Sequence, residues 1–409
     1  MKNSVRNIPT FEEIKDARNV LKKFIFKTPL YKSRTFSKII GTNIFLKNEA
    51  VQKTGSFKVR GALYKIQSLT EEEVKYGIIA ASAGNHAQGV AYAASIRNIP
   101  CTIVMPQNAS PAKVAATRSY NAKVILKGKD YEEAWISAME IARNEKKNII
   151  HAFDDSQIIS GQGSIGLEII EDLSNIDEVY LPVGGGGLAA GVAIAIKSRN
   201  KNIKIIGVES KAFPAMKKSL EKGTLQTRKG DFTIADGISV KSPGKITFEI
   251  AKRYLDDVVL IDDNSIAKTM FLLMERSKTV VEPAGAASLA YLLSNRHKYK
   301  NKNVVAILSG GNIDMYLLGQ IVARGLMQMN RMLKIFIQLP DKPGALKTVV
   351  DGISELSVNI VEVIHDRLST NISVGTAGVY LSLELEDEKH AIRLIDFLRK
   401  KKIDFKIVS

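Results

Sequence analysis

Short runs of β-branched residues alternate with longer helical patterns from about Asn43 to Ser309, and this alternation constrains the fold more than any other feature. The apolar runs are nearly continuous, which is typical of parallel sheets covered by helices on both faces. The predicted strands are IIAASA from Ile78, CTIVMP from Cys101, KVIL from Lys123, VYLPV from Val179, KIIGV from Lys204 and VVAILS from Val304. Helices are predicted over 111–120, 131–145, 188–199 and 265–277. In such an α/β fold, ligands bind where carboxyl ends of strands lead through turns into helices.

The pattern changes near Met327–Met332. The remaining sequence contains the strand LKIFIQL, a helix over 343–356, the strands VNIVEVI and AGVYLSLEL, a helix over 389–399 and the strand DFKIVS. This β-α-β-β-α-β order predicts a small ferredoxin-like α+β domain. We therefore expect two domains with a boundary at about residue 330, in line with a length of 409 residues.

Composition excludes several classes of protein. The single cysteine, Cys101, excludes disulfides within the chain and thiolate metal clusters, and no metal site is predicted. The polar opening MKNSVRNIPT and the short, glycine-broken apolar runs predict a cytoplasmic protein without a leader or a membrane partner. The formal charge of +17 comes from Lys and Arg spread along the chain. We interpret it as surface decoration and expect no nucleic-acid partner.

The first segment that carries chemistry is TGSFKVRGA, which contains Lys58. By itself, Lys58 is one lysine among dozens, and a solvated surface position is the simpler interpretation. It stands, however, at a predicted helix start between Gly55 and Gly61, with the apolar neighbours Phe57 and Val59. An amine in apolar surroundings loses stabilisation of its charge, so its pKa falls and it becomes available as a nucleophile or base.

The second segment is SAGNHAQG, directly after the strand from Ile78. Asn85 can both donate and accept hydrogen bonds there, although a plain turn with a helix cap explains the same letters. His86 is more readily structural than catalytic, because no Ser–His–Asp partners are evident.

The third segment is GGGGL, from Gly184 to Leu188, which follows a strand and opens a helix. Successive glycines let backbone N–H groups curl around one anion, aided by the helix dipole, and we favour a phosphate site over a flexible turn. The lack of a following Lys–Ser/Thr excludes a nucleotide P-loop. The match of Gly161–Gly166 to G-x-G-x-x-G does not immediately follow a strand, so we reject a dinucleotide fingerprint.

The fourth segment is SGGN, which follows the strand VVAIL and begins at Ser309. A serine at this strand end would be a neutral hydrogen-bond partner for a buried ring nitrogen, and a glycine turn is the alternative.

Together and in this order, the four segments resemble the fold-type II pyridoxal-phosphate enzymes, specifically the threonine/serine dehydratases, over about Phe11 to Gly325. The resemblance implies a tryptophan synthase β-like catalytic domain over 1–329 with a small subdomain nested at about 50–155. It also implies pyridoxal 5′-phosphate as cofactor and a homodimer or homotetramer.

The same resemblance assigns roles to individual residues. Lys58 would be the Schiff-base lysine and the base at Cα, with Phe57 beside the cofactor. Asn85 would bind the pyridoxal 3′-oxygen, Gly184, Gly185, Gly186, Gly187 and Leu188 would cradle the phosphate, and Ser309 would face the ring nitrogen. The substrate carboxylate would lie against Ser56, Ser82, Ala83, Gly84 and His86, because N–H groups at a helix start favour anions.

The tail, 330–409, is similar to ACT domains, which sense small ligands and are often fused to enzymes of amino-acid metabolism. LPDKPGAL, from Leu339 to Leu346, matches their first loop and helix entry. The resemblance implies an allosteric enzyme with an amino-acid effector at an interface between chains, such as isoleucine in isoleucine biosynthesis.

The implied reaction is the dehydration and deamination of L-threonine to 2-oxobutanoate and ammonia, and of L-serine to pyruvate. A serine racemase on the same scaffold is one alternative, but it needs a second base where this chain has Ala83. The racemase divalent-metal site is also in doubt, because Glu209 is followed six residues later by Ala215, and only a carbonyl-based monovalent-ion site stays open.

A non-catalytic amino-acid sensor is the other alternative, although it would not need an intact lysine and phosphate loop. Substrate preference, effector and biosynthetic or catabolic role stay open at this point.

Overall fold

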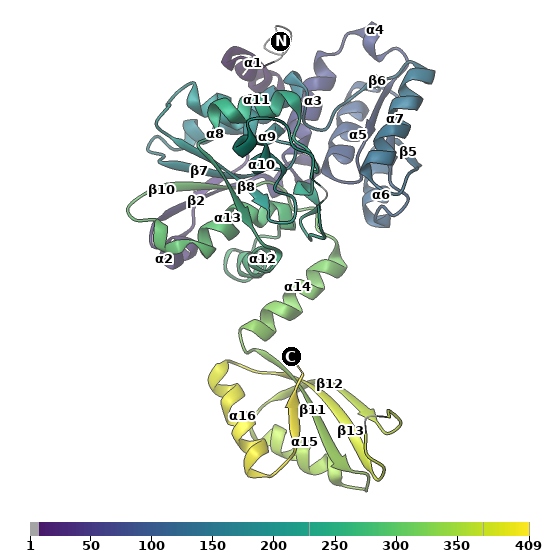
Figure 1. The fold of residues 1–409 in the computed structure, drawn as a ribbon, viewed down its shortest axis with the longest axis vertical. Coiled ribbons are helices and arrows are strands. Elements are labelled where there is room, and N and C mark those ends of the chain that lie inside the picture. Colours follow the sequence, from purple (N-terminus) through teal and green to yellow (C-terminus); the bar gives the residue numbers. More distant parts are fainter. Residues whose placement is uncertain (1–7, 229, 371, 409) are drawn as a thin grey trace. The chain divides into compact units, whose positions relative to one another are not determined.

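The computed structural model describes residues 8–228, 230–370 and 372–408 of the chain (Figure 1). It divides into two compact units, Met1–Asp314 and Met315–Ser409. The helix α14 (Met315–Gln328), which we had assigned to the end of the catalytic domain, belongs to the second unit. The first seven residues of the predicted catalytic domain, and with them most of its polar opening, lie outside the described residues.

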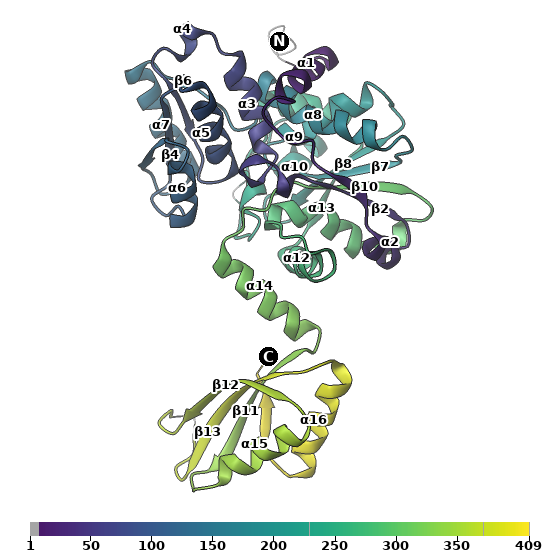
Figure 2. The same cartoon turned by 180° about the vertical axis from the view of Figure 1, so that it is seen from behind.

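The first unit contains a six-stranded sheet with the strand order β1-β2-β10-β7-β8-β9. Its strands are β1 (Leu30–Lys32), β2 (Asn43–Asn48), β7 (Glu178–Pro182), β8 (Lys204–Ser210), β9 (Asp257–Ile261) and β10 (Asn303–Leu308). All neighbouring strands are parallel except β1, which pairs antiparallel with β2. Apolar side chains on the strands explain why helices cover both faces. On one face lie α8 (Ser156–Asp172), α9 (Gly187–Lys197) and α11 (Lys245–Tyr254), and on the other lie α12 (Asp263–Ser277) and α13 (Pro283–Ser294) (Figures 1 and 2).

A second, four-stranded parallel sheet of the same unit has the order β5-β4-β3-β6. Its strands are β3 (Ile78–Ala81), β4 (Cys101–Met105), β5 (Lys123–Leu126) and β6 (Asn148–Ile149). This sheet and its helices α5, α6 and α7 lie within the range in which we placed the small nested subdomain. Its apolar core joins the strands to α3 and α5, so the segment that carries Lys58 lies between the two sheets.

The helices of the first unit follow the expected alternation. They are α1 (Phe11–Leu21), α2 (Arg34–Ile40), α3 (Lys58–Ser68), α4 (Glu71–Val74), α5 (Asn85–Arg97), α6 (Pro111–Arg118), α7 (Tyr131–Glu145), α8 (Ser156–Asp172), α9 (Gly187–Lys197), α10 (Ala215–Lys222), α11 (Lys245–Tyr254), α12 (Asp263–Ser277) and α13 (Pro283–Ser294). Short 3₁₀ turns are η2 (Glu49–Val51), η3 (Lys53–Gly55), η4 (Asp236–Ile238) and η5 (Arg296–Lys298). Aspartates cap several helix starts: Asp130, Asp155 and Asp262 accept backbone N–H groups of α7, α8 and α12.

The glycines of the rejected G-x-G-x-x-G match lie inside the buried helix α8. A Cβ at Gly161 would be 2.6 Å from the Arg60 carbonyl oxygen of α3, and one at Gly163 would be 2.9 Å from the Gly191 carbonyl oxygen of α9. These glycines therefore allow three helices to pack closely, and they form no phosphate loop.

The second unit forms an antiparallel sheet of order β12-β13-β11-β14 with two helices. After α14 its elements are β11 (Met332–Pro340), α15 (Ala345–Glu355), β12 (Asn359–Asp366), β13 (Thr376–Glu384), α16 (Glu388–Lys400) and β14 (Phe405–Ile407). An apolar core joins the strands to the helix faces. The predicted β-α-β-β-α-β order is confirmed. Within the described ranges, no helix is long and apolar enough to span a membrane.

Candidate active site

Three of the four candidate segments begin at the carboxyl ends of adjacent parallel strands. The strand β2 leads into the Lys58 segment, β10 into Ser309 and β7 into Gly184–Leu188, and their registers align these ends. The fourth segment, Ser82–His86, follows β3 of the small sheet. This is the edge at which open parallel sheets bind ligands.

Lys58 is the first residue of α3, and its side chain is partly exposed, so a small molecule can reach it. Its Nζ donates a hydrogen bond to the carbonyl oxygen of Ala152 at 3.1 Å and lies 5.4 Å from the ring centroid of Phe57. Burial lowers the pKa of Lys58 to about 8, against a smaller opposing effect of the Glu282 carboxylate. The amine is therefore far more available near neutral pH than that of a surface lysine.

The lysine segment pairs with the SGGN segment through the backbone. Ser56 and Gly310 form an antiparallel bridge, the Phe57 N–H donates to the Ser309 carbonyl at 3.1 Å, and the Gly311 N–H donates to the Gly55 carbonyl at 2.9 Å. Ser309 is almost fully buried. These bonds hold the backbone segments that carry Lys58 and Ser309 next to each other.

Two hydroxyl groups beside this pairing have no hydrogen-bond partner among the described residues. They are Ser56 Oγ and Thr54 Oγ1, both buried. Because a buried hydroxyl without a partner costs free energy, such groups point to a polar ligand that satisfies them.

The four-glycine turn between β7 and α9 lies against the segment that accepts the lysine hydrogen bond. Gly186 has a φ of 94°, a conformation that favours glycine. The N–H groups of Gly184, Gly185 and Gly186 donate to no acceptor among the described residues. Free N–H groups at the start of a helix favour anions, so this turn is compatible with the phosphate site that the sequence predicts there.

The Asn85 side chain, at the start of α5, belongs to a chain of amides. Its Oδ1 accepts from Asn312 Nδ2 at 2.7 Å, and its Nδ2 donates to Glu282 Oε1 at 2.7 Å. Asn312 Nδ2 also donates to the Thr54 carbonyl at 2.7 Å. No sequence motif contains Glu282, and Asn312 is predicted only as part of the SGGN motif. The only signal for Glu282 was its place before the Pro283 that begins a helix.

The predicted substrate loop forms the turn between β3 and α5. Ser82 Oγ accepts from the Gly84 N–H at 3.2 Å, and Ala83 packs against the core of the small sheet. The His86 ring is buried, bonds to the Ile150 carbonyl at 3.1 Å and has a pKa lowered by burial to about 3. His86 therefore offers a ligand its backbone N–H, while its side chain is committed to the fold.

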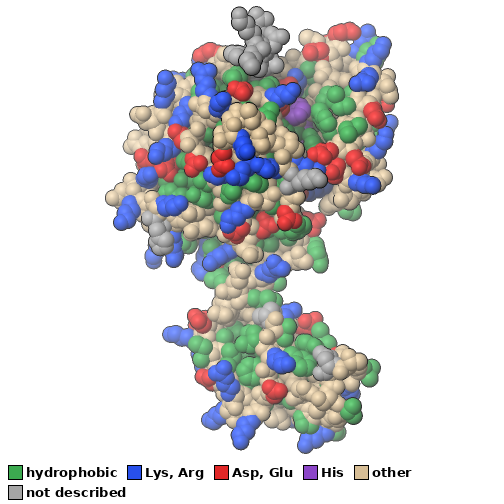
Figure 3. Space-filling model, in the orientation of Figure 1, with side chains coloured by type: hydrophobic (Ala, Val, Ile, Leu, Met, Phe, Trp, Pro, Cys, Tyr) green, Lys and Arg blue, Asp and Glu red, His purple; other side chains and the backbone are tan. Residues whose placement is uncertain are grey.

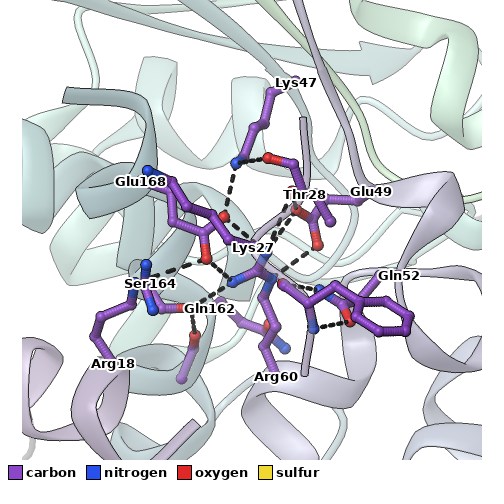
Figure 4. Close-up of polar contacts among 12 residues, drawn as sticks. Arg18, Lys27, Thr28, Lys47, Glu49, Gln52, Arg60, Gln162, Ser164 and Glu168 are labelled. Carbon is purple, nitrogen blue, oxygen red and sulfur yellow. Dashed lines mark hydrogen bonds and ion pairs between the residues drawn. The ribbon is translucent and has the colours of Figure 1, made fainter. Parts of the chain in front are cut away.

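A buried ion cluster includes Arg60 of α3, the helix that begins at Lys58 (Figure 4). Arg60 follows Lys58 by two residues on α3 and forms ion pairs with Glu49 at 2.7 Å and Glu168 at 2.8 Å. Lys47 forms an ion pair with Glu168 at 2.6 Å. All four side chains are fully buried. Arg18 of α1, which is also buried, lies 3.6 Å from Glu168, so three cationic and two anionic side chains join α1, β2, η2, α3 and α8.

Glu209 was considered in the sequence as a possible ion ligand. Its two carboxyl oxygens accept the N–H groups of Met216 and Lys217 at 2.7 and 2.9 Å, which caps α10. The part of the chain that the structure describes contains no group of three or more His, Cys, Asp or Glu placed to hold a metal. On the face drawn in Figure 3, Lys and Arg side chains are spread with acidic side chains among them.

These groups fit pyridoxal phosphate. A reachable lysine amine suits its aldehyde, the free N–H groups of the glycine turn suit its phosphate, and the amide of Asn85 suits its ring oxygen. The hydroxyl of a buried serine suits a ring nitrogen that need not be protonated. The parallel-sheet fold and this site define a fold-type II pyridoxal-phosphate enzyme.

Comparison with known proteins gives the same answer. The chain belongs to the pyridoxal-phosphate dependent enzyme family, which matches residues 21–310. It is 45% identical to an L-threonine ammonia-lyase of Thermotoga maritima, over 98% of this chain and 100% of that protein. Among solved structures it resembles threonine deaminase isoform 2 of Solanum lycopersicum (TM-score 0.74, 36% identity, 78% of this chain and 90% of that chain). It also resembles maize serine racemase (TM-score 0.73, 33% identity, 78% of this chain and 99% of that chain).

Proposed function

We propose that this chain is an L-threonine ammonia-lyase, which converts L-threonine to 2-oxobutanoate and ammonia and also accepts L-serine. The observation that carries the proposal is the position of the Lys58 amine, whose pKa is lowered to about 8. The amine donates a hydrogen bond to the carbonyl of Ala152, and the next residue, Phe153, packs on the glycine turn. The whole-length similarity to an L-threonine ammonia-lyase supports the substrate.

Each part of the site would have its own role in the reaction. When bound, pyridoxal phosphate supplies an electron sink for negative charge at the substrate Cα. The backbone of Gly184–Leu188 and the start of α9 would hold the phosphate, and the Asn85 amide would donate to the ring oxygen. The Lys58 amine would hold the cofactor aldehyde, and as a free amine its Nζ would take the proton from the substrate Cα.

Ser309 gives the reaction its direction. A carboxylate opposite the ring nitrogen would hold that nitrogen protonated, whereas a serine hydroxyl does not. With Ser309 at that position, the chain would therefore favour loss of the β-hydroxyl from the substrate. The N–H groups at the start of α5, from Ser82 to His86, and the Ser56 hydroxyl bind the substrate carboxylate.

A serine racemase is the second candidate, since one similar structure carries that name. The position at which we expect the second base of a racemase is Ala83, whose methyl group cannot transfer a proton. The higher identity to the Thermotoga relative, 45% against 33%, also favours the ammonia-lyase.

We further propose that 330–409 is an ACT domain that binds an amino-acid effector where two such domains pair, in a cytoplasmic homodimer or homotetramer. The βαββαβ order and the Gly344 turn, with a φ of 88° before α15, support this proposal. Isoleucine is the effector that isoleucine biosynthesis from 2-oxobutanoate would require.

The test is an oxo-acid assay of the purified protein with L-threonine and L-serine, each repeated with added isoleucine. Release of 2-oxobutanoate from L-threonine is expected, and isoleucine is expected to lower the rate. A protein that binds pyridoxal phosphate but releases no oxo-acid from either substrate would contradict the proposed activity.

A further inference from the structure

Glu282 lies at the centre of the site, although no motif contains it. It immediately precedes α13, and its backbone N–H donates to the Gly310 carbonyl at 3.0 Å. Its side chain is only 5% exposed. A Cβ at Gly310 would be 2.6 Å from Glu282 Oε1, so the carboxylate lies against the backbone next to Ser309.

The hydrogen bonds around Asn85 run in one direction and end at Glu282. Asn312 Nδ2 uses both of its hydrogens, one on the Thr54 carbonyl and one on Asn85 Oδ1. Asn85 Nδ2 then donates one hydrogen to Glu282 Oε1, because an ionised carboxylate only accepts. If the Asn85 amide were reversed, its Nδ2 would face Asn312 Nδ2 and its Oδ1 would face Glu282 Oε1, and neither contact would be a hydrogen bond. The carboxylate therefore fixes the amide and leaves its second Nδ2 hydrogen free for a ligand.

The charge of Glu282 also acts on Lys58. Burial raises the pKa of Glu282 to about 7; Asp236 of η4 raises it further, while Asn85, Lys113 of α6 and Lys58 of α3 oppose the rise. In the other direction, Glu282 raises the pKa of Lys58 against the larger effect of burial. Above pH 7 the carboxylate is ionised and is a countercharge for the amine.

We propose that Glu282 is a positioning residue for the cofactor: it fixes the Asn85 amide as a donor to the ring oxygen and is the countercharge of Lys58. The inference rests on the proposed function insofar as Asn85 and Lys58 bind pyridoxal phosphate. It assigns no proton transfer to Glu282.

The experiment compares full-length Glu282→Gln with the unaltered protein, both stripped of cofactor. Two quantities are measured without any amino-acid substrate: the dissociation constant for pyridoxal phosphate at pH 8, and the pH at which its rate of attachment is half-maximal. The variant keeps the shape of the side chain but loses its charge. We expect about tenfold weaker binding, the equivalent of one charged hydrogen bond. We also expect the half-maximal pH to fall, because a lysine without its countercharge loses its proton more readily.

Glu178→Gln is the matched control. Glu178 is a buried carboxylate on β7, at the end of the strand opposite the glycine turn, and is bonded to Tyr180 and Lys302. It should leave both quantities unchanged. If either quantity in Glu282→Gln equals that of the unaltered protein, or if Glu178→Gln shifts both equally, the proposal is overturned.

Glu282→Asp separates position from charge, and it serves also if the Gln variant does not fold. Aspartate keeps the charge but is too short to reach Asn85. We expect an unchanged half-maximal pH with weaker cofactor binding, and binding as tight as in the unaltered protein would refute the positioning role. Because no substrate is used, these measurements of cofactor binding can be interpreted even if the protein does not convert threonine. If the unaltered protein bound no cofactor, that result would refute the proposed function instead.

Discussion

The ring of Phe153 fills the space into which a side chain at Gly185 would project, since a Cβ there would lie 2.4 Å from the ring. The preceding residue, Ala152, accepts the hydrogen bond of the Lys58 amine. One short segment therefore contacts both the amine and the glycine turn, which are the two parts of the site that the cofactor must join.

Gly185→Ala should weaken pyridoxal phosphate binding by at least about tenfold, because the new methyl group forces either Phe153 or the turn to move. Equilibrium dialysis of the cofactor-free protein measures this. Gly319→Ala is the control: Gly319 lies within α14 with open space at its Cβ, so that variant should bind the cofactor normally. Unchanged binding in Gly185→Ala would show that the turn does not hold the phosphate.

Attachment of pyridoxal phosphate to the cofactor-free protein should accelerate with rising pH, with a half-maximum near pH 8. Only the free amine reacts, and burial lowers the pKa of Lys58 from 10.5 to about 8. Stopped-flow absorbance over pH 6 to 10 gives the profile. A half-maximum near that of an ordinary lysine would mean that burial does not tune this amine.

Arg60→Ala should destabilise the protein by about 3–5 kcal/mol, because it leaves the buried Glu49 carboxylate without its ion-pair partner, while Glu168 keeps only Lys47 and the more distant Arg18. Denaturant unfolding followed by fluorescence measures the loss. Lys218→Ala removes an exposed pair with Glu221 on α10 and should cost less than about 1 kcal/mol. Equal losses in the two variants would contradict a structural role for the cluster.

The unaltered protein should convert L-serine to pyruvate without forming D-serine, since Ala83 offers no proton for the opposite face of the substrate. Chiral chromatography of the reaction mixture distinguishes the two products. Accumulation of D-serine ahead of pyruvate would instead support the racemase alternative.

Patterns that depend on neighbouring residues could be predicted from the sequence. The strand over 123–126 and the helix over 131–145 were predicted to the residue, because a β-branched run and a capped amphipathic helix are local features. The helix α12 begins two residues earlier than predicted, at the Asp262 cap. The buried helices α8 and α13 were not predicted. The helix α8 contains three glycines, which are more typical of turns, and α13 is apolar on nearly all of its faces.

Contacts between distant segments could not be predicted in this way. Asn85 and Glu282 are 197 positions apart, and only the folding of two sheets brings them together. The same holds for Arg60 and Glu168, which are 108 positions apart and whose pairing no local pattern in the sequence indicates. Burial decides the role of such groups, and burial is a property of the whole fold.

The most direct measurement of the central claim is to treat the protein with pyridoxal phosphate, reduce it with borohydride and locate the added mass by peptide mapping. We expect a single pyridoxyl phosphate group on Lys58. In Lys58→Ala, both this group and the yellow absorption band of the cofactor should be absent. A stoichiometric group on another lysine, or an unchanged band in Lys58→Ala, would contradict it.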